Sequence, residues 1–124
     1  MQNPVGWFEI YVADMARAKA FYEHVLAQPL AEMPSSDPQM HMVAFPMAAG
    51  TPGAGGALVS HPMRQPSGEG TLVYFSCADC AVEAGRVNAA GGMLVRPRTP
   101  IGPFGFIALA TDTEGNAIGF HSFQ

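Results

Sequence analysis

The chain has 124 residues, of which 48% are hydrophobic and only 13% are charged, with a formal net charge of -4. This length suits one domain that buries roughly two thirds of the surface of its unfolded chain. The only lysine, Lys19, and the scattered arginines form no basic stripe, so we expect no nucleic-acid partner. No apolar run approaches the roughly 20 residues of a membrane helix, and the N-terminus lacks a signal-peptide pattern. We therefore expect a cytoplasmic protein without a membrane partner.

The charged fraction is about half that of an average globular domain. A surface with so few charges favours association, so we expect part of it to be covered by a second copy of the chain. The composition thus predicts a homodimer.

The first half of the chain begins with the alternating stretch GWFEIYV (6–12), which predicts a strand. Asp14 follows as a helix N-cap, and Pro29 marks the end of that helix. Further strands are expected over 40–47 (MHMVAFPM) and 57–61 (ALVSH). The apolar face of the helix comprises Ala18, Phe21, Tyr22, Val25 and Leu26.

The second half repeats this order after the polar stretch PMRQPSGEG. Residues 71–77 (TLVYFSC) alternate, Asp79 stands where a helix cap belongs, and the helix is expected to stop at Gly91 and Gly92. Three more strands are predicted in MLVRPR, FGFIALAT and NAIGFHS, separated by the PIGP and DTEG turns. The segment PIGPFG is read either as a lid over a cavity or as a plain turn.

Aligning Asp14 with Asp79 superimposes the two halves, which indicates an internal duplication of a βαβββ unit. We expect an α+β fold in a single domain over 1–124, with modules 1–61 and 71–124 joined by the linker 62–70. Each module forms a curled mixed sheet backed by one helix, and the two sheets enclose a cavity for a small ligand.

Cys77 and Cys80 have the spacing of a redox or metal-binding pair. A zinc site needs about four ligands, and no second pair of this kind exists in the chain. We therefore interpret Cys77 as the end of a strand and Cys80 as the start of a helix.

Three stretches resemble the vicinal oxygen chelate superfamily, which includes glyoxalase I, bleomycin-resistance proteins and extradiol dioxygenases. They are FEIYVADMARAKAFYEHVL, GGALV and TDTEGNAIGFHS. The resemblance implies metal ligands on the first, fourth, fifth and last strands. Those positions fall here on Trp7, Val59, Leu72 and Gly119, none of which has a side chain that can bind a metal. Glyoxalase I activity is therefore not expected.

Alternation along the strands predicts which side chains face the cavity. Glu9 and His121 are its most informative polar groups and the predicted catalytic residues. The residues predicted to contact the ligand are Trp7, Tyr11, His61, Leu72 and Tyr74. Methionines in the second and third strands, which are Met33, Met40, Met42 and Met47, are read either as a compliant cavity wall or as ordinary core.

Three interpretations of Glu9 and His121 stay open. They can form a general acid/base pair, they can be two ligands of a divalent metal at a non-standard site, or they can form a buried structural hydrogen bond. The chain is accordingly either an enzyme, resembling the lyases, isomerases or dioxygenases of the superfamily, or a non-catalytic protein that sequesters a small molecule such as a drug.

Overall fold

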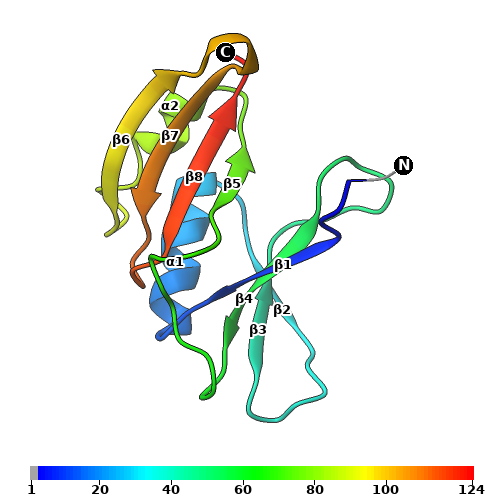
Figure 1. Ribbon diagram of the computed structural model, residues 1–124. Coiled ribbons are helices and arrows are strands. Elements are labelled where there is room, and N and C mark those ends of the chain that lie inside the picture. The colour runs from blue at the N-terminus through cyan, green and yellow to red at the C-terminus, as the bar shows by residue number, and fades with distance from the viewer. Residues whose placement is uncertain (1–2) are drawn as a thin grey trace.

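Residues 3–124 are described by a computed structural model, and they form two four-stranded mixed sheets, neither of which closes into a barrel (Figure 1). The N-terminal sheet has the order β1-β4-β3-β2, with β1 parallel to β4 and the other pairs antiparallel. Its elements are β1 (Trp7–Tyr11), α1 (Met15–Leu26), β2 (Ala31–Met33), β3 (His41–Ala44) and β4 (Gly55–Ser60).

The C-terminal sheet repeats this topology in the order β5-β8-β7-β6, again with one parallel pair, β5 and β8. Its elements are β5 (Val73–Ser76), α2 (Cys80–Ala84), β6 (Met93–Pro100), the short 3₁₀ helix η1 (Gly102–Phe104), β7 (Phe106–Thr111) and β8 (Ala117–Ser122). The predicted α+β class with two βαβββ modules is confirmed.

Both helices begin at the predicted caps. The side chain of Asp14 accepts a hydrogen bond from the Arg17 backbone N–H at 3.1 Å, and that of Asp79 accepts one from Ala81 at 3.0 Å. The second helix is shorter than predicted, because α2 ends at Ala84 and the chain continues to Gly92 in turns. Gly85 follows Ala84 directly, and a glycine is a poor residue for helix propagation.

Phe75 of β5 joins the two modules in one hydrophobic core. Its ring lies 6.3 Å from Phe8, 5.9 Å from Tyr22 and 5.6 Å from Phe45, all of which belong to the N-terminal module. In Figure 1, α1 lies beside α2 on one side of the C-terminal sheet, and the N-terminal sheet extends away at an angle. The face of each sheet that points away from α1 and α2 is not covered by either helix.

The turn between β7 and β8 ties the modules together a second time. Asn116 donates to the Tyr11 carbonyl at 2.8 Å and accepts from the Ser67 N–H at 2.9 Å. Asp112 accepts from the buried Tyr22 hydroxyl at 2.6 Å. Burial, followed by the Asp112 charge, raises the pKa of Tyr22 well above its usual value. The aspartate and asparagine of the DTEGN signature therefore hold the modules in place.

Candidate functional site

The face of β1 that points away from the helices carries the side chains that alternation predicts. Ile10 is buried in the core and Phe8 packs against that core, while Trp7, Glu9 and Tyr11 are not part of it. On the same face of the N-terminal sheet, Val59 and Ala57 are completely buried. They are covered by Tyr11 and by three of the methionines, Met33, Met40 and Met42. These methionines fill much of the N-terminal face.

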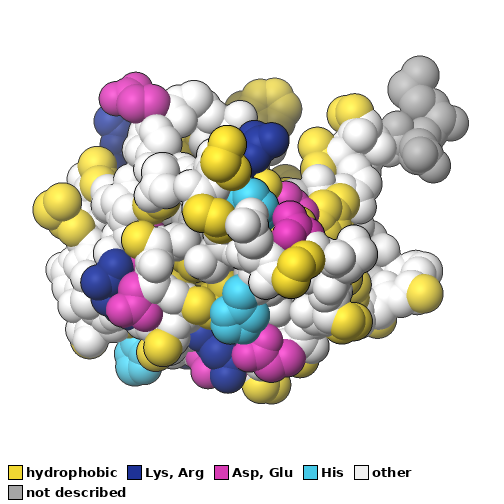
Figure 2. All heavy atoms as spheres, turned by 90° about the horizontal axis from the view of Figure 1, so that it is seen from below, with side chains coloured by type: hydrophobic (Ala, Val, Ile, Leu, Met, Phe, Trp, Pro, Cys, Tyr) yellow, Lys and Arg dark blue, Asp and Glu magenta, His cyan; other side chains and the backbone are white. Residues whose placement is uncertain are grey.

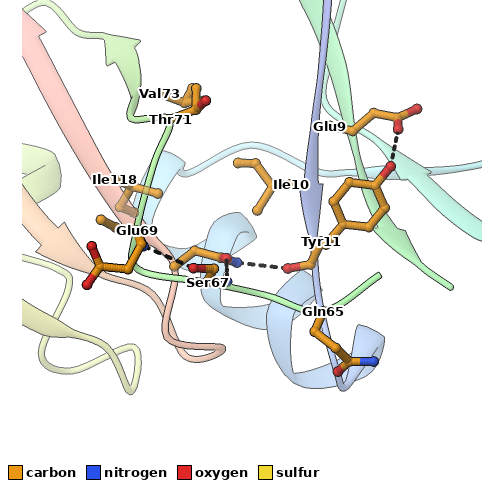
Figure 3. A pocket seen from close by; sticks show the side chains of 11 residues that line it. Glu9, Ile10, Tyr11, Gln65, Ser67, Glu69, Thr71, Val73 and Ile118 are labelled. Atoms are coloured by element: carbon orange, nitrogen blue, oxygen red, sulfur yellow. Dashed lines mark hydrogen bonds between the residues drawn. The ribbon is translucent and has the colours of Figure 1, made fainter. Parts of the chain in front are cut away.

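The carboxylate of Glu9 is held by its neighbours along β1. The Tyr11 hydroxyl donates to Oε1 at 2.7 Å (Figure 3), and the Trp7 indole N–H donates to Oε2 at 3.3 Å. The hydrogen bond to Glu9 is also the main reason that the pKa of Tyr11 is raised. Since a carboxylate can accept about four hydrogen bonds, Glu9 keeps acceptor capacity for a ligand.

A hollow of about 500 Å³ lies on the open face of the C-terminal sheet. Its walls combine strands β5, β7 and β8 with the segment around η1, and none of them carries Asp, Glu, Lys or Arg. The lining residues are Tyr74, Ser76, Ile101, Phe104, Ile107 and His121. The sequence pattern placed Tyr74 and His121 on this face, and Ser76 follows from the same alternation along 71–77. The pattern did not name Ile101, Phe104 and Ile107 individually, although Ile101 and Phe104 lie in the PIGPFG segment, which one reading placed over the cavity, and the alternation in FGFIALAT marks Ile107.

His121 has a defined orientation in this hollow. Its Nε2 lies 2.7 Å from the Phe104 carbonyl oxygen, and its ring packs edge-on against Phe123 at 4.8 Å between centroids. A carbonyl oxygen only accepts, so Nε2 carries the hydrogen and donates it. In the neutral imidazole, Nδ1 is then left as an acceptor.

Glu9 and His121 do not meet within one chain. Glu9 lines a second hollow, of about 230 Å³, which lies between β1 and the linker 62–70. This hollow has no lining residue in common with the hollow that His121 lines. Figure 3 shows Glu9 and Tyr11 on one side of β1 and Ile10 on the other. No hydrogen bond or ion pair joins Glu9 to His121 within residues 3–124.

The profile of one protein family matches residues 5–120, almost the whole chain; it is described as the Glyoxalase/Bleomycin resistance protein/Dioxygenase superfamily. The chain belongs to this superfamily. No curated protein matches its sequence.

Solved structures of the glyoxalase superfamily share the fold of this chain. A glyoxalase/bleomycin resistance protein/dioxygenase domain from Frankia sp. EAN1pec superimposes with a TM-score of 0.73 at 18% identity, covering 100% of both chains. A glyoxalase-related enzyme from Fulvimarina pelagi gives 0.67 at 16% identity, covering 98% of this chain and 88% of the other. Glyoxalase I from Zea mays gives 0.71 at 18% identity, covering 97% of this chain. The chain spans about half of the maize protein, 46% of its length.

The four positions that the sequence predicted for the superfamily's metal ligands hold residues that do not fit a metal. Trp7 donates its N–H to Glu9, Val59 is buried among methionines, and Leu72 precedes β5. At Gly119 an added Cβ would lie 2.5 Å from two ring carbons of Tyr74, so a tyrosine ring fills the space of the expected ligand. Among the described residues, no three His, Cys, Asp or Glu side chains are grouped as metal ligands.

Three of the five predicted ligand contacts line neither hollow: Trp7, His61 and Leu72. His61 follows β4 instead of ending it, and both of its ring nitrogens are engaged. Nδ1 accepts from the Met63 N–H at 3.0 Å, and Nε2 lies 3.1 Å from the Asp37 carboxylate. The structure therefore gives His61 local partners at the end of β4.

Proposed function

We propose that this superfamily member binds a small organic molecule in the hollow on the open face of the C-terminal sheet. The supporting observation is the hollow itself, whose volume of about 500 Å³ and mostly apolar walls match those of small-molecule sites. Its polar groups are few and lie next to one another, since Ser76 pairs with His121 in the β5–β8 register. Such a lining favours a mostly apolar ligand with one or two polar atoms.

A small-molecule screen by thermal shift, followed by titration of the hits, tests this proposal. Tyr74→Ala and Phe104→Ala should weaken binding because both side chains line the hollow. Met63→Ala is the matched control, since Met63 is 80% exposed and lines neither hollow. Hits that bind equally well to all three variants would exclude this hollow as the site.

We also propose that a second copy of the chain completes the site. Tyr74 and Phe104, which line the hollow, are 44% and 68% exposed, and Trp7 of β1 is 38% exposed, so aromatic surface is left for a partner to cover. Figure 2, which views the molecule from below, shows hydrophobic side chains at the surface with charged side chains between them. A homodimer that sets β1 of one copy against the hollow of the other brings a Glu9 to a His121.

Mixed dimers test this arrangement without knowledge of the interface. If the site is shared and both residues act on the ligand, Glu9→Gln and His121→Ala homodimers both bind the hits weakly, and mixing the two restores binding, because one site of each mixed dimer has both residues. A monomer in sedimentation velocity, or mixtures that bind no better than their components, would contradict the shared site.

Two chemical roles follow for the completed site. A carboxylate oriented by two donors and an imidazole with a free Nδ1 are the pair that acid/base catalysis needs, and this favours an enzyme of the lyase, isomerase or dioxygenase type. A relocated divalent metal would need the same two residues and the same second copy. In a drug-sequestering protein Glu9→Gln leaves ligand binding nearly unchanged, whereas in the enzyme it abolishes turnover of a bound substrate.

The cytoplasmic location and the lack of a nucleic-acid partner stay predictions from composition. None of the helices within residues 3–124 is long and apolar enough to cross a membrane.

A further inference from the structure

The ring of Tyr74 lies against the backbone of Gly119 on the neighbouring strand. The β5–β8 register pairs the two residues, and a Cβ at position 119 would lie 2.5 Å from Cδ1 and Cε1 and 3.2 Å from Cγ of the tyrosine. The ring therefore rests on β8 in the space that any side chain at 119 would take. Strand β8 covers one face of the ring, and Tyr74, which is 44% exposed, lines the hollow.

The Tyr74 ring forms the flat base of the hollow, and aliphatic side chains form part of its sides. Ile107 of β7 and Ile101 before η1 line the same hollow, and Phe104 borders it with most of its side chain exposed. A planar aromatic molecule can stack on an aromatic ring over its whole face, which a saturated ring of similar size cannot do.

The polar groups of the hollow favour a ligand that donates a hydrogen bond. Nδ1 of the neutral His121 is an acceptor without a partner among the described residues, because Nε2 is bound to Phe104. The Ser76 hydroxyl, beside it in the register, has no hydrogen-bond partner within the described residues either. None of the lining residues carries a carboxylate, ammonium or guanidinium group, so within one copy only the imidazole of His121 can offset the burial of a charged ligand. The Glu9 carboxylate that a second copy would add is a further acceptor for an O–H or N–H donor and disfavours an anion.

We propose that the hollow selects an uncharged planar aromatic ligand that carries a hydroxyl or N–H group. Its ring stacks on Tyr74, and its O–H or N–H donates to Nδ1 of His121, with Ser76 as a second hydrogen-bonding group. This inference rests on the proposed function and names the class of ligand for the same hollow.

Three probes of similar size separate the parts of the inference: phenol, anisole and cyclohexanol. Phenol has both the ring and the donor, anisole lacks the donor, and cyclohexanol lacks the flat ring. Titration of the isotope-labelled protein, followed by the amide signals of Ser76, Ile107 and His121, gives the affinity of each. Phenol should bind roughly fivefold more tightly than anisole, as expected for one neutral hydrogen bond. Phenol should also bind roughly fivefold more tightly than cyclohexanol, because only the aromatic ring can stack on Tyr74.

Variants assign each preference to its residue. His121→Phe should remove the preference for phenol over anisole, and Tyr74→Leu should remove the preference for phenol over cyclohexanol. The comparison of probes on the unaltered protein stands even if a variant fails to fold.

The outcomes separate this inference from the proposed function. If the three probes bind to these residues with equal affinity, the ligand class is wrong while the hollow stays a binding site. If phenol and anisole bind equally, the role of His121 is wrong. If no probe shifts these signals, and no hit from the screen does, both proposals fail.

Discussion

The carboxylate of Glu114, in the turn between β7 and β8, is bound by the guanidinium group of Arg17 in α1 at 2.7 Å. It also accepts from the backbone N–H groups of Ala13 and Asp14, at 2.9 and 2.8 Å. Burial of this side chain opposes ionisation, but the hydrogen bonds from Arg17 and the backbone outweigh it and lower the pKa of Glu114 to about 2. The glutamate of the DTEGN signature thus links one module to the start of the other module's helix.

Replacing Glu114 by glutamine should lower the free energy of unfolding by about 3 kcal/mol, because an amide NH₂ cannot accept from the donors that converge there. Urea denaturation measures the loss. Glu69→Gln is the control: Glu69 is exposed, and a change there should cost no more than about 0.5 kcal/mol. Equal stability of the two variants would mean that Glu114 does not hold the modules together.

The low pKa of Glu114 predicts that the free energy of unfolding decreases at acidic pH. Its pKa in the folded protein, about 2, lies below the ordinary value of 4.5. Its contribution is therefore complete above pH 4.5 and is lost as the pH falls toward 2. The loss is at most about 3 kcal/mol, since each pKa unit corresponds to about 1.4 kcal/mol and the half-exposed Arg17 is partly screened by solvent. Denaturation curves should show a difference between the unaltered protein and Glu114→Gln that shrinks across this range; a constant difference would contradict it.

Two glycines covered by aromatic rings should respond differently to alanine. A Cβ at Gly56 would lie 2.4 Å from the ring of Phe8, which is held in the core 5.5 Å from Phe45. Gly56→Ala should therefore cost about 2 to 3 kcal/mol through overpacking. Gly119→Ala should cost less than about 1 kcal/mol, because the half-exposed Tyr74 can swing outward. That movement removes the floor of the hollow, so ligand binding should fall more than stability. Thermal unfolding and probe titration of both variants check this order.

The thiols should be inert in the folded protein. Burial, followed by the nearby Glu83 carboxylate, raises the pKa of Cys77 to about 12, and Cys80 has no exposed surface. At pH 8 Cys77 is then almost entirely the thiol, whereas the thiolate is the reactive form. An aromatic disulfide reagent should label neither cysteine until denaturant is added, after which both react. Rapid reaction of one thiol in the native protein would instead favour the redox reading of the CADC sequence.

Divalent metals should not stabilise the protein. The four positions that carry ligands in the superfamily's metal enzymes are Trp7, Val59, Leu72 and Gly119, and none of these side chains is a metal donor. We expect no change in the unfolding temperature with nickel, zinc, manganese or iron, and no stoichiometric metal in the purified protein. If added metal raises the unfolding temperature of the unaltered protein but not that of Glu9→Gln or His121→Ala, a metal is held between two copies.

Local patterns predicted much of the fold. Asp14 and Asp79 could be recognised as caps because a cap is defined by its immediate neighbours, and alternation assigned the two faces of β1 correctly. The three-residue strand Ala31–Met33 is too short for a periodic signal. The early end of α2 depends on turns after Gly85 that bring Val87 into the core, which helical spacing alone does not distinguish from a longer helix.

By itself the sequence determined the superfamily, the order of the elements and the side chains that leave the core, because each of these depends on residues close together in the chain. Only the tertiary structure decided which of those side chains share a hollow, that Tyr74 covers Gly119, and that Glu9 and His121 have separate partners. Such contacts depend on how strands pair and how the modules are oriented. The spacing of apolar residues within one segment contains no information about the strand register between distant segments or about the angle between two sheets.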